Sequence, residues 1–583
     1  MSKPNNIKRT IFLFFGILFL STYGYSQGTW TPIASLAPDT NNGVTLLLSD
    51  GTVIVKTRSG GGDGYGNIWN KLTPDIHGSY VNGTWSTIAP MHDTRLYFSS
   101  QLLKDGRMYV AGGEYGTGGA TAEIYDPQAN TWTVLPSPVL TVGDVLGDAS
   151  SEILPNGKIL QAVVVSQVNP SKETTIYDPM ANTFAVGPVC HGSNDEAAWV
   201  KLPDNSILFV DLFSTNAERY IPALNQWVVD ASAPINIYGS YDYETGAGLL
   251  LPDGRVFYMG GNGKTLFYTP SGNNANGTWA IGPTIPNGLA APDAAAAMMA
   301  NGKILCAFSP ISTSAVNVFL SPTYFYEFDY TNNSFTKILA PNGDTVLNEA
   351  CYATMMLDLP DGTILYGDTT SNQYYVYKPG GTPVAAGKPI INNVIQSNCD
   401  FSVVGTLFNG ISEGAAYGDD WQMTTNFPVV RLSSGTNVYY ARSFNWNSRG
   451  VQRGSELDTT QFALPVGLPI GTYSLVVIAN GISSNPYTFV YSLCSADINQ
   501  YATNMQVNVY PNPAYEDIYI TSAQHKLSEI SITDMLGREL TNEKKEILNY
   551  ETQMSIANLP NGVYFVNVKT SEGVSVHKIV IQH

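Results

Sequence analysis

Seven short hairpin signals recur along most of this chain, and they constrain its fold more than any other feature. In each signal an apolar run leads into Asp-Gly or a close variant, and a second apolar run follows. The turn residues are Asp50, Asp105, Asn156, Asp204, Asp253, Asn301 and Asp361. Asp-Gly and Asn-Gly favour tight turns because both residues accept positive φ. Seven such signals at a spacing of about fifty residues predict the blades of a β-propeller.

A second element follows each hairpin: an aromatic strand, a polar turn and then Trp or Phe, as in IYDPQANTWTVLP and IYDPMANTFAVGP. The seventh copy, YYVYKPGG, stops before its Trp. The missing piece occurs near the start of the chain, in GTWTPIASL at residues 28–36. We therefore expect this N-terminal strand to complete the last blade, which closes the ring and leaves no open edge between first and last blades.

These repeats resemble kelch repeats and, more closely, the propeller of galactose oxidase-like proteins, over residues 28–382. Residues 388–493 follow a linker that contains Pro and Gly, and their strands FPVVRL and GTYSLVVIANG resemble the immunoglobulin-like domain that follows the propeller in that family. The expected fold class is all-β: a seven-bladed β-propeller, an immunoglobulin-like sandwich and a small C-terminal β-sandwich.

Both ends of the chain carry export features. Lys3, Lys8 and Arg9 precede the apolar run IFLFFGILFL, which predicts a signal peptide over residues 1–27. Residues 500–583 contain VYPNP, ITDMLGREL, LPNGVYFVNV and HKIVIQ in this order. They resemble the C-terminal sorting domain of type IX secretion cargo. This resemblance implies the type IX secretion machinery as a partner and a secreted or outer-surface location.

The net charge limits the expected binding partners, and the cysteine content limits the possible disulfides. The formal net charge is −18, and an acidic surface repels phosphate groups, so nucleic acid is not expected as a partner. We expect a monomer. Five cysteines occur, and the sequence does not decide the pairing of Cys190, Cys306 and Cys351. Cys399 and Cys494 lie near the two ends of the predicted sandwich, and export permits a disulfide between them.

The galactose oxidase resemblance implies a test for copper chemistry. Those enzymes bind one copper with two tyrosines and two histidines, and one tyrosine is cross-linked to a cysteine. Counting back from the turns places Tyr97 and Tyr352 at the tyrosine positions, Asn42 at the cysteine position and Ala353 at one histidine position. The resemblance places the other histidine in a loop of the sandwich domain, where this sequence has Arg442 nearby and no histidine. Copper is held well by imidazole or thiolate and never by a guanidinium, so copper is not expected as a cofactor.

Acidic residues gather at equivalent positions of the repeat, in a chain that is only 13% charged. The residue eight positions before each turn residue should begin the innermost strand of its blade, near the central channel. These residues and their sequence neighbours give the candidate ligand-binding residues Tyr97, Asp148, Glu196, Glu244 and Asp293. Such a ring of oxygens suits a polyhydroxylated sugar or Ca²⁺. The competing interpretation is that these side chains cap strand ends.

We therefore predict a secreted or cell-surface binding protein for carbohydrate or another extracellular ligand. The alternative is an enzyme on the same scaffold: a carboxylate-dependent glycan hydrolase or lyase, or a diverged copper radical oxidase. The absent cysteine and histidines favour the binding protein, and no catalytic residue is assigned. Ca²⁺ is the one cofactor that the acidic positions would suit.

Overall fold

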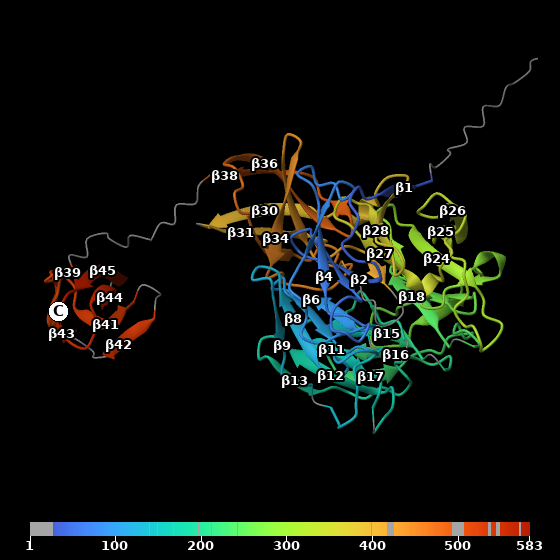
Figure 1. Ribbon diagram of the computed structural model, residues 1–583, viewed down its shortest axis with the longest axis horizontal. Coiled ribbons are helices and arrows are strands. Elements are labelled where there is room, and N and C mark those ends of the chain that lie inside the picture. Colours follow the sequence, from blue (N-terminus) through green and yellow to red (C-terminus); the bar gives the residue numbers. More distant parts are fainter. Residues whose placement is uncertain are drawn as a thin grey trace, which may run out of the picture. The chain divides into compact units, whose positions relative to one another are not determined.

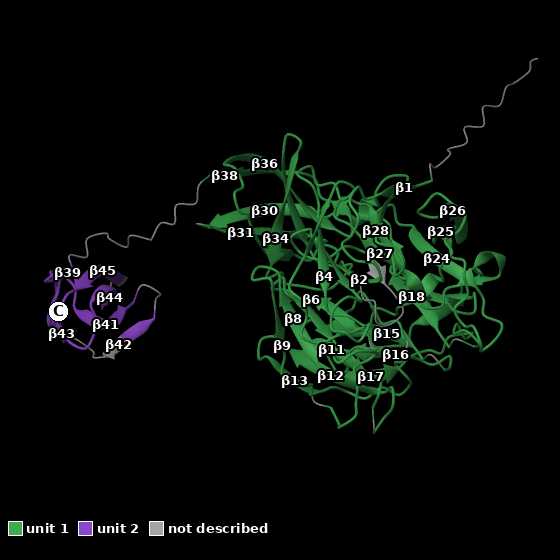
Figure 2. Ribbon diagram, in the orientation of Figure 1, with its two compact units in different colours: residues 1–492 green, residues 493–583 purple. Residues whose placement is uncertain are grey.

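The computed structural model describes residues 27–138, 140–148, 150–166, 168–195, 197–211, 213–241, 243–397, 399–416, 425–492, 507–534, 538–543, 549–570 and 573–583. Within these ranges the chain forms strands and three single turns of 3-10 helix, which confirms the all-β prediction. It divides into two compact units, residues 1–492 and residues 493–583 (Figure 2). Each unit is described by itself.

Seven antiparallel sheets follow one another in the first unit (Figure 1). The first three are β2 (Asn42–Leu47), β3 (Val53–Thr57), β4 (Trp69–Thr73) and β5 (Thr84–Thr87); β6 (Ser99–Leu102), β7 (Met108–Ala111), β8 (Ala122–Asp126) and β9 (Thr131–Val134); and β10 (Ser151–Ile153), β11 (Ile159–Val163), β12 (Glu173–Asp178) and β13 (Thr183–Val186).

The next three sheets are β14 (Val200–Lys201), β15 (Ile207–Val210), β16 (Ala217–Ile221) and β17 (Gln226–Val229); β18 (Thr245–Leu250), β19 (Val256–Gly260), β20 (Thr265–Thr269) and β21 (Thr278–Ile281); and β23 (Ala296–Met298), β24 (Ile304–Pro310), β25 (Tyr324–Asp329) and β26 (Ser334–Ile338). Two short strands join the last of these, β22 (Leu289–Ala290) on β24 and β32 (Ala415–Ala416) on β23. In all six sheets the four main strands pair in chain order.

The seventh sheet combines the two ends of the repeat region. It contains β27 (Thr354–Asp358), β28 (Ile364–Asp368), β29 (Tyr375–Lys378) and, on its outer edge, β1 (Thr29–Pro32). Thr29 pairs with Lys378 and Pro32 with Tyr375. The Trp30 indole N–H donates to the Leu339 carbonyl at 2.9 Å. The predicted closure by the N-terminal strand is therefore confirmed.

The predicted hairpins join the first and second strands of the seven sheets. In the first hairpin Gly51 adopts φ 75°, and an Asp50 carboxylate oxygen accepts the Thr52 amide N–H at 3.0 Å. Glycine is needed there because other residues enter this left-handed region only with strain. The first strands of neighbouring sheets contact each other, as β2 does β27 and β6 does β10, so they surround a common axis.

The sheets have two opposite ends. The end that carries the seven turn residues is called the turn face. The other end is called the loop face, because it carries the longer connections from second to third strands and from fourth strands to the next sheet. Alternation of strand direction places all seven hairpin turns at the same end. Residues at the start of the first strands therefore lie toward the loop face.

The remaining strands of the first unit form one sheet whose main path runs β30-β31-β35-β34-β33-β36-β37, with β38 paired to β36. Their bounds are β30 (Ile390–Ser397), β31 (Asp400–Thr406), β33 (Val429–Ser434), β34 (Asn437–Phe444), β35 (Asp458–Ala463), β36 (Gly471–Ala479), β37 (Ile482–Ser483) and β38 (Tyr487–Tyr491). This region covers the turn face: Ser49 Oγ donates to the Ser443 carbonyl at 2.7 Å, and Gln452 Nε2 to the Leu251 carbonyl at 2.9 Å. Its immunoglobulin-like classification stays a prediction.

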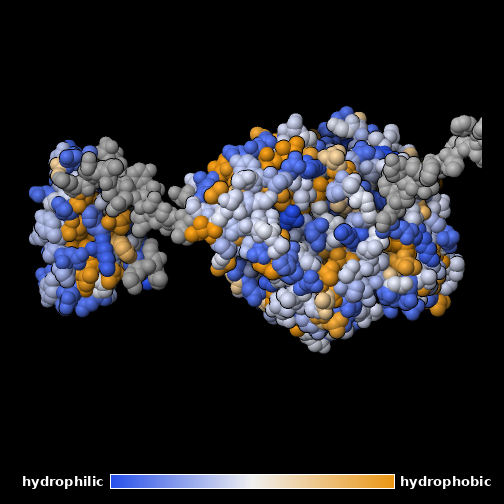
Figure 3. Space-filling model, turned by 90° about the horizontal axis from the view of Figure 1, so that it is seen from above, coloured by the Kyte–Doolittle hydropathy of each residue, from blue (hydrophilic) through white to orange (hydrophobic). Residues whose placement is uncertain are grey.

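The second unit contains two sheets. One is β39 (Val507–Tyr510), β40 (Asp517–Ser522) and β43 (Glu551–Ser555); the other has the order β42 (Glu539–Glu543), β41 (Leu527–Thr533), β44 (Gly562–Thr570) and β45 (Gly573–Ile581). Alternate residues of both sheets, including Ile518, Ile530 and Val566, are fully buried in a core of their own. Hydrophobic side chains also gather in a band on the face of this unit that Figure 3 shows.

Several predictions concern residues outside the described ranges. Residues 1–26 of the predicted signal peptide, Glu196 and Cys494 are among them. The Cys399–Cys494 disulfide therefore stays a prediction. Cys190, Cys306 and Cys351 are buried. In the part of the chain that the structure describes, no helix is both long and apolar enough to cross a membrane.

Candidate functional site

The predicted ligand-binding residues lie at the loop face, just before the first strands of their sheets. Tyr97, Asp148 and Asp293 have left-handed backbones, with φ of 55°, 47° and 49°. Non-glycine residues seldom adopt this conformation, so its recurrence shows that the three positions are structurally equivalent. Glu244 lies next to Thr245, which opens β18. Glu196 lies outside the described residues.

Tyr97 and Asp148 belong to a group that also contains Tyr65, Glu114 and Tyr115; we call these five residues the tyrosine cluster. The rings of Tyr65 and Tyr115 stack with centroids 5.3 Å apart, and Tyr97 meets Tyr115 edge to face at 6.1 Å. The Glu114 amide N–H donates to the Tyr97 carbonyl at 3.0 Å. The Tyr115 residue is 41% exposed. An aromatic platform therefore faces solvent at the loop face.

Carboxylates adjoin this platform. A side-chain hydrogen bond with Glu114, burial, and the charges of Glu114 and Asp148 together raise the pKa of Tyr115 to about 12. The phenol therefore stays protonated under physiological conditions. The cluster presents ring faces beside carboxylate oxygens, a combination that can stack on an apolar surface and accept hydrogen bonds from hydroxyl groups.

Glu244 and Asp293 lie together in another part of the loop face. The Asp293 amide N–H donates to the Thr245 carbonyl at 2.9 Å, and Asp293 as a whole residue is only 9% exposed. Exposed aromatic residues are found beside Glu244 in the chain: Tyr243 is 51% exposed, and its ring centroid is 6.1 Å from that of Phe213. Asp293 is thus largely covered, whereas the tyrosine cluster is open.

Sequence reasoning missed Tyr65, Tyr115 and Phe213, which lie in the connections from second to third strands. The sequence does contain a signal that could have identified Tyr65 and Tyr115. An aromatic residue interrupts the glycine-rich stretches GGGDGYGN and GGEYGTGG directly after second strands. Glycines there supply the tight loop, and an aromatic side chain among them has no obvious place in a core.

The residues at the expected copper positions do not fit a copper centre. Asn42 Nδ2 donates to the carbonyls of Asp39 and Ser371 at 3.1 and 3.0 Å, and Ala353 has no donor atom. Arg442 donates to the Asp105 carbonyl at 3.0 Å, so it lies at the turn face, at the opposite end of β6 from Tyr97. Among the described residues no group of three His, Cys, Asp or Glu side chains is arranged to hold a metal ion.

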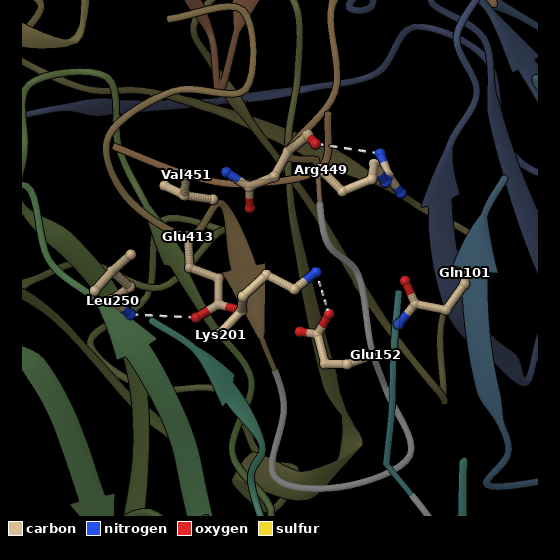
Figure 4. A pocket seen from close by; sticks show the side chains of 8 residues that line it. Gln101, Glu152, Lys201, Leu250, Glu413, Arg449 and Val451 are labelled. Carbon is tan, nitrogen blue, oxygen red and sulfur yellow. Dashed lines mark hydrogen bonds and ion pairs between the residues drawn. The ribbon is translucent and has the colours of Figure 1, made fainter. Parts of the chain in front are cut away.

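A buried polar cluster lies near the axis, toward the turn face (Figure 4). Gln101, Glu152, Lys201 and Leu250 come from four neighbouring first strands, and Glu413, Asn426, Arg449 and Val451 come from the region that covers the turn face. Lys201 Nζ lies 2.7 Å from a Glu152 oxygen. Arg449 donates to the Leu102 carbonyl at 2.6 Å.

The cavity between these side chains has a volume of about 20 Å³. That space holds one water molecule and excludes a sugar. The axis is therefore filled at this level by the covering region. Burial lowers the pKa of Arg449 to about 10 and, with the Glu152 charge, raises the pKa of Glu413 from 4.5 to about 8.

The Glu413 shift predicts a pH-dependent stability. Between pH 4.5 and about 8 the folded protein retains a proton that the unfolded chain releases, so the free energy of unfolding should fall as pH rises. The loss amounts to roughly 5 kcal/mol over this window. Glu413→Gln should remove this slope and raise stability at pH 8, as measured by urea denaturation at pH 5, 6.5 and 8. Exposed Glu456→Gln is the control, and equal slopes in wild type and Glu413→Gln would contradict the expectation.

Comparison with protein families identifies two parts of the chain. Residues 508–582 match the secretion system C-terminal sorting domain, and residues 104–138 match the kelch motif. The kelch match begins at the second predicted hairpin and ends after β9. The resemblances to kelch repeats and to the sorting domain are thereby confirmed: the chain carries a kelch motif over residues 104–138 and a sorting domain over residues 508–582.

Comparison with solved structures gives distant similarities. A fungal alcohol oxidase of the AA5 family in complex with copper is 16% identical, with a TM-score of 0.47, over 80% of this chain and 100% of that one. Streptogramin B lyase is 13% identical, with a TM-score of 0.41, over 61% of this chain and 99% of that one. A comparison with curated proteins found no match.

Proposed function

We propose that this protein is an exported binding protein and that the tyrosine cluster on its loop face binds carbohydrate. The observation that carries the proposal is the stacked Tyr65–Tyr115 pair, in which Tyr115 is exposed, beside the Glu114 and Asp148 carboxylates. It lies at the loop face, opposite the end on which the covering region packs. The sorting domain supports export, which would bring the loop face into contact with extracellular glycans.

The chemistry of the cluster suits a sugar. The C–H face of a pyranose ring is apolar and packs on an aromatic ring, while sugar hydroxyls donate to carboxylate oxygens. The Tyr115 phenol is engaged with Glu114, so the carboxylate is held in place before a ligand arrives. Such preorganisation reduces the entropy lost on binding. The net charge of −18 argues against anionic polymers as ligands.

Removing the ring of Tyr115 should weaken this binding without affecting the fold. The purified protein would be screened on an array of neutral plant and microbial glycans, and affinity for the best probe measured by calorimetry. Tyr115→Ala and Asp148→Asn should each weaken binding roughly tenfold, the effect of one lost stacking or charge-assisted contact. Thermal unfolding should stay unchanged for Tyr115→Ala because the side chain is substantially exposed.

Tyr243→Ala is the matched control, because Tyr243 is an exposed tyrosine on the same face outside the cluster. Absence of binding to any glycan, or equal binding by wild type and Tyr115→Ala, would contradict the proposal. Repeating the titration with EDTA and with added Ca²⁺ separates direct sugar recognition from a calcium-dependent site. Release of new reducing ends from the bound glycan would instead favour the enzyme alternative.

A further inference from the structure

The last strand of the sorting domain has an edge that is only partly covered. β45 pairs with β44 along its whole length, from Thr570 opposite Gly573 to Gly562 opposite Ile581. On its other side, within the described residues of this unit, only the C-terminal part has hydrogen-bond partners. The Ala514 amide N–H donates to the Val580 carbonyl at 2.8 Å, and Asn512 Nδ2 donates to the Lys578 carbonyl at 2.9 Å. Residues 573–577 lie beyond this cover.

The backbone direction in this uncovered stretch follows from the strand geometry. Lys578 and Val580 direct their backbone groups away from β44, toward residues 512–514. The pairing of β44 with β45 shows no register shift, so every second residue repeats this direction. Val574 and Val576 therefore present their N–H and C=O groups to the open edge. In the described part of the second unit, β44 is the only strand paired with β45, and β39 contacts β45 without pairing with it.

The sequence of this stretch lacks the features that usually protect an edge. Edge strands are commonly shielded by Lys, Pro, a bulge or a covering segment. Residues 573–577 read GVSVH, without proline and without a residue charged at neutral pH when His577 is deprotonated. Burial lowers the pKa of His577, and its Nε2 lies 2.8 Å from Ser575 Oγ. Val574 and Val576 are 48% and 55% exposed.

We propose that residues 573–577 are where the type IX secretion machinery docks, by adding a strand of its own to β45. The sorting domain implies a contact with this machinery, and the open edge offers main-chain donors and acceptors of a kind that strand addition uses. The two exposed valines flank the edge and would pack on side chains of the added strand. This inference rests on the sorting domain and is independent of the proposed carbohydrate binding.

Proline at position 576 tests the proposal, because it removes a backbone N–H that faces the open edge and leaves the ladder to β44 intact. Full-length Val576→Pro would be produced in a bacterium with a type IX system, and its amount in medium, cell surface and periplasm measured by immunoblot. Export should fall roughly tenfold, about the effect of one backbone hydrogen bond at an interface. Val576→Thr keeps the N–H and should be exported normally.

A fold measurement separates docking from misfolding. Thermal unfolding and protease resistance of the purified Val576→Pro protein should match those of the wild type. If the proline variant unfolds, Val574→Lys with Val576→Lys replaces it, since lysines on an exposed edge preserve the strand and oppose strand addition. Wild-type export of the folded proline or lysine variant would overturn the proposal.

The competing occupant of the edge is a second copy of the chain. Sedimentation of the wild-type and Val576→Pro proteins distinguishes it. A wild-type dimer that the proline variant converts to a monomer, with export unchanged, would overturn machinery docking. A monomer in both cases with reduced export supports it. Loss of export on deleting the whole domain, combined with normal export of Val576→Pro, would retain the sorting function and reject this surface.

Discussion

Removal of residues 493–583 is expected to leave the protein in the periplasm, while the amount in the medium and on the cell surface falls to background. The reason is that the deleted unit carries the sorting domain, residues 508–582. The rest of the chain should remain folded, because each unit buries its own hydrophobic residues. Fractionation and immunoblotting measure export, and calorimetry of the purified truncated protein measures folding.

The folding measurement decides whether a loss of export comes from the missing sorting domain or from misfolding. A truncated protein that unfolds at the wild-type temperature but stays in the periplasm supports a sorting role. Normal amounts in the medium would show that the domain is dispensable for export. Fusing residues 493–583 to an unrelated periplasmic protein provides the reciprocal test, in which the carrier should appear outside the cell.

Deletion of residues 27–33 is expected to destabilise the first unit strongly. Without β1, strand β29 loses its partner from Thr29 to Pro32, and the seventh sheet gains an open edge. The Trp30 ring, which lies 4.6 Å from Tyr377 and 5.5 Å from Tyr366, leaves a gap. Loss of a packed Trp costs about 3 kcal/mol even at the low end, which alone should lower the melting temperature of a unit of this size by roughly 3 °C, and the open strand edge should lower it further.

A point variant separates the two contributions to this loss. Trp30→Ala keeps the strand and removes the ring together with its hydrogen bond to the Leu339 carbonyl. Its melting temperature should lie between those of the wild type and the deletion. Calorimetry on the three proteins measures the order. Equal melting temperatures for wild type and deletion would show that β1 does not close the ring.

The carbohydrate proposal depended on the structure more than on the sequence. Equal offsets from the hairpin turns placed Tyr97 and Asp148 correctly at the loop face. Tyr65 and Tyr115 were not found, because their importance comes from a stacking contact between two loops of neighbouring sheets. A repeat offset locates a residue along its own strand, and it gives no distance to the next sheet.

The position of Arg442 relative to the propeller could not be predicted from the sequence for a related reason. Arg442 is the residue that the resemblance offered near the place of the last histidine, and it contacts Asp105 at the turn face. The covering region can reach the propeller from either end without any change in its strand pattern. Only the packing of that region on the turn face decides which of its residues reach the axis, and Glu413 and Arg449 do so.

The sequence by itself determined two features: the hairpins, which depend on local turn chemistry, and the closing strand, which the incomplete seventh repeat indicated. Asp-Gly and Asn-Gly turns require positive φ, so seven hairpins could be recognised one by one, and the absent Trp of the last repeat pointed to Trp30. The tertiary structure alone decided the solvent exposure of Tyr115, the burial of Glu413 and the open edge at Val576. Each of these depends on which distant segments surround a residue, and neighbours of that kind are set by packing, which no local pattern encodes.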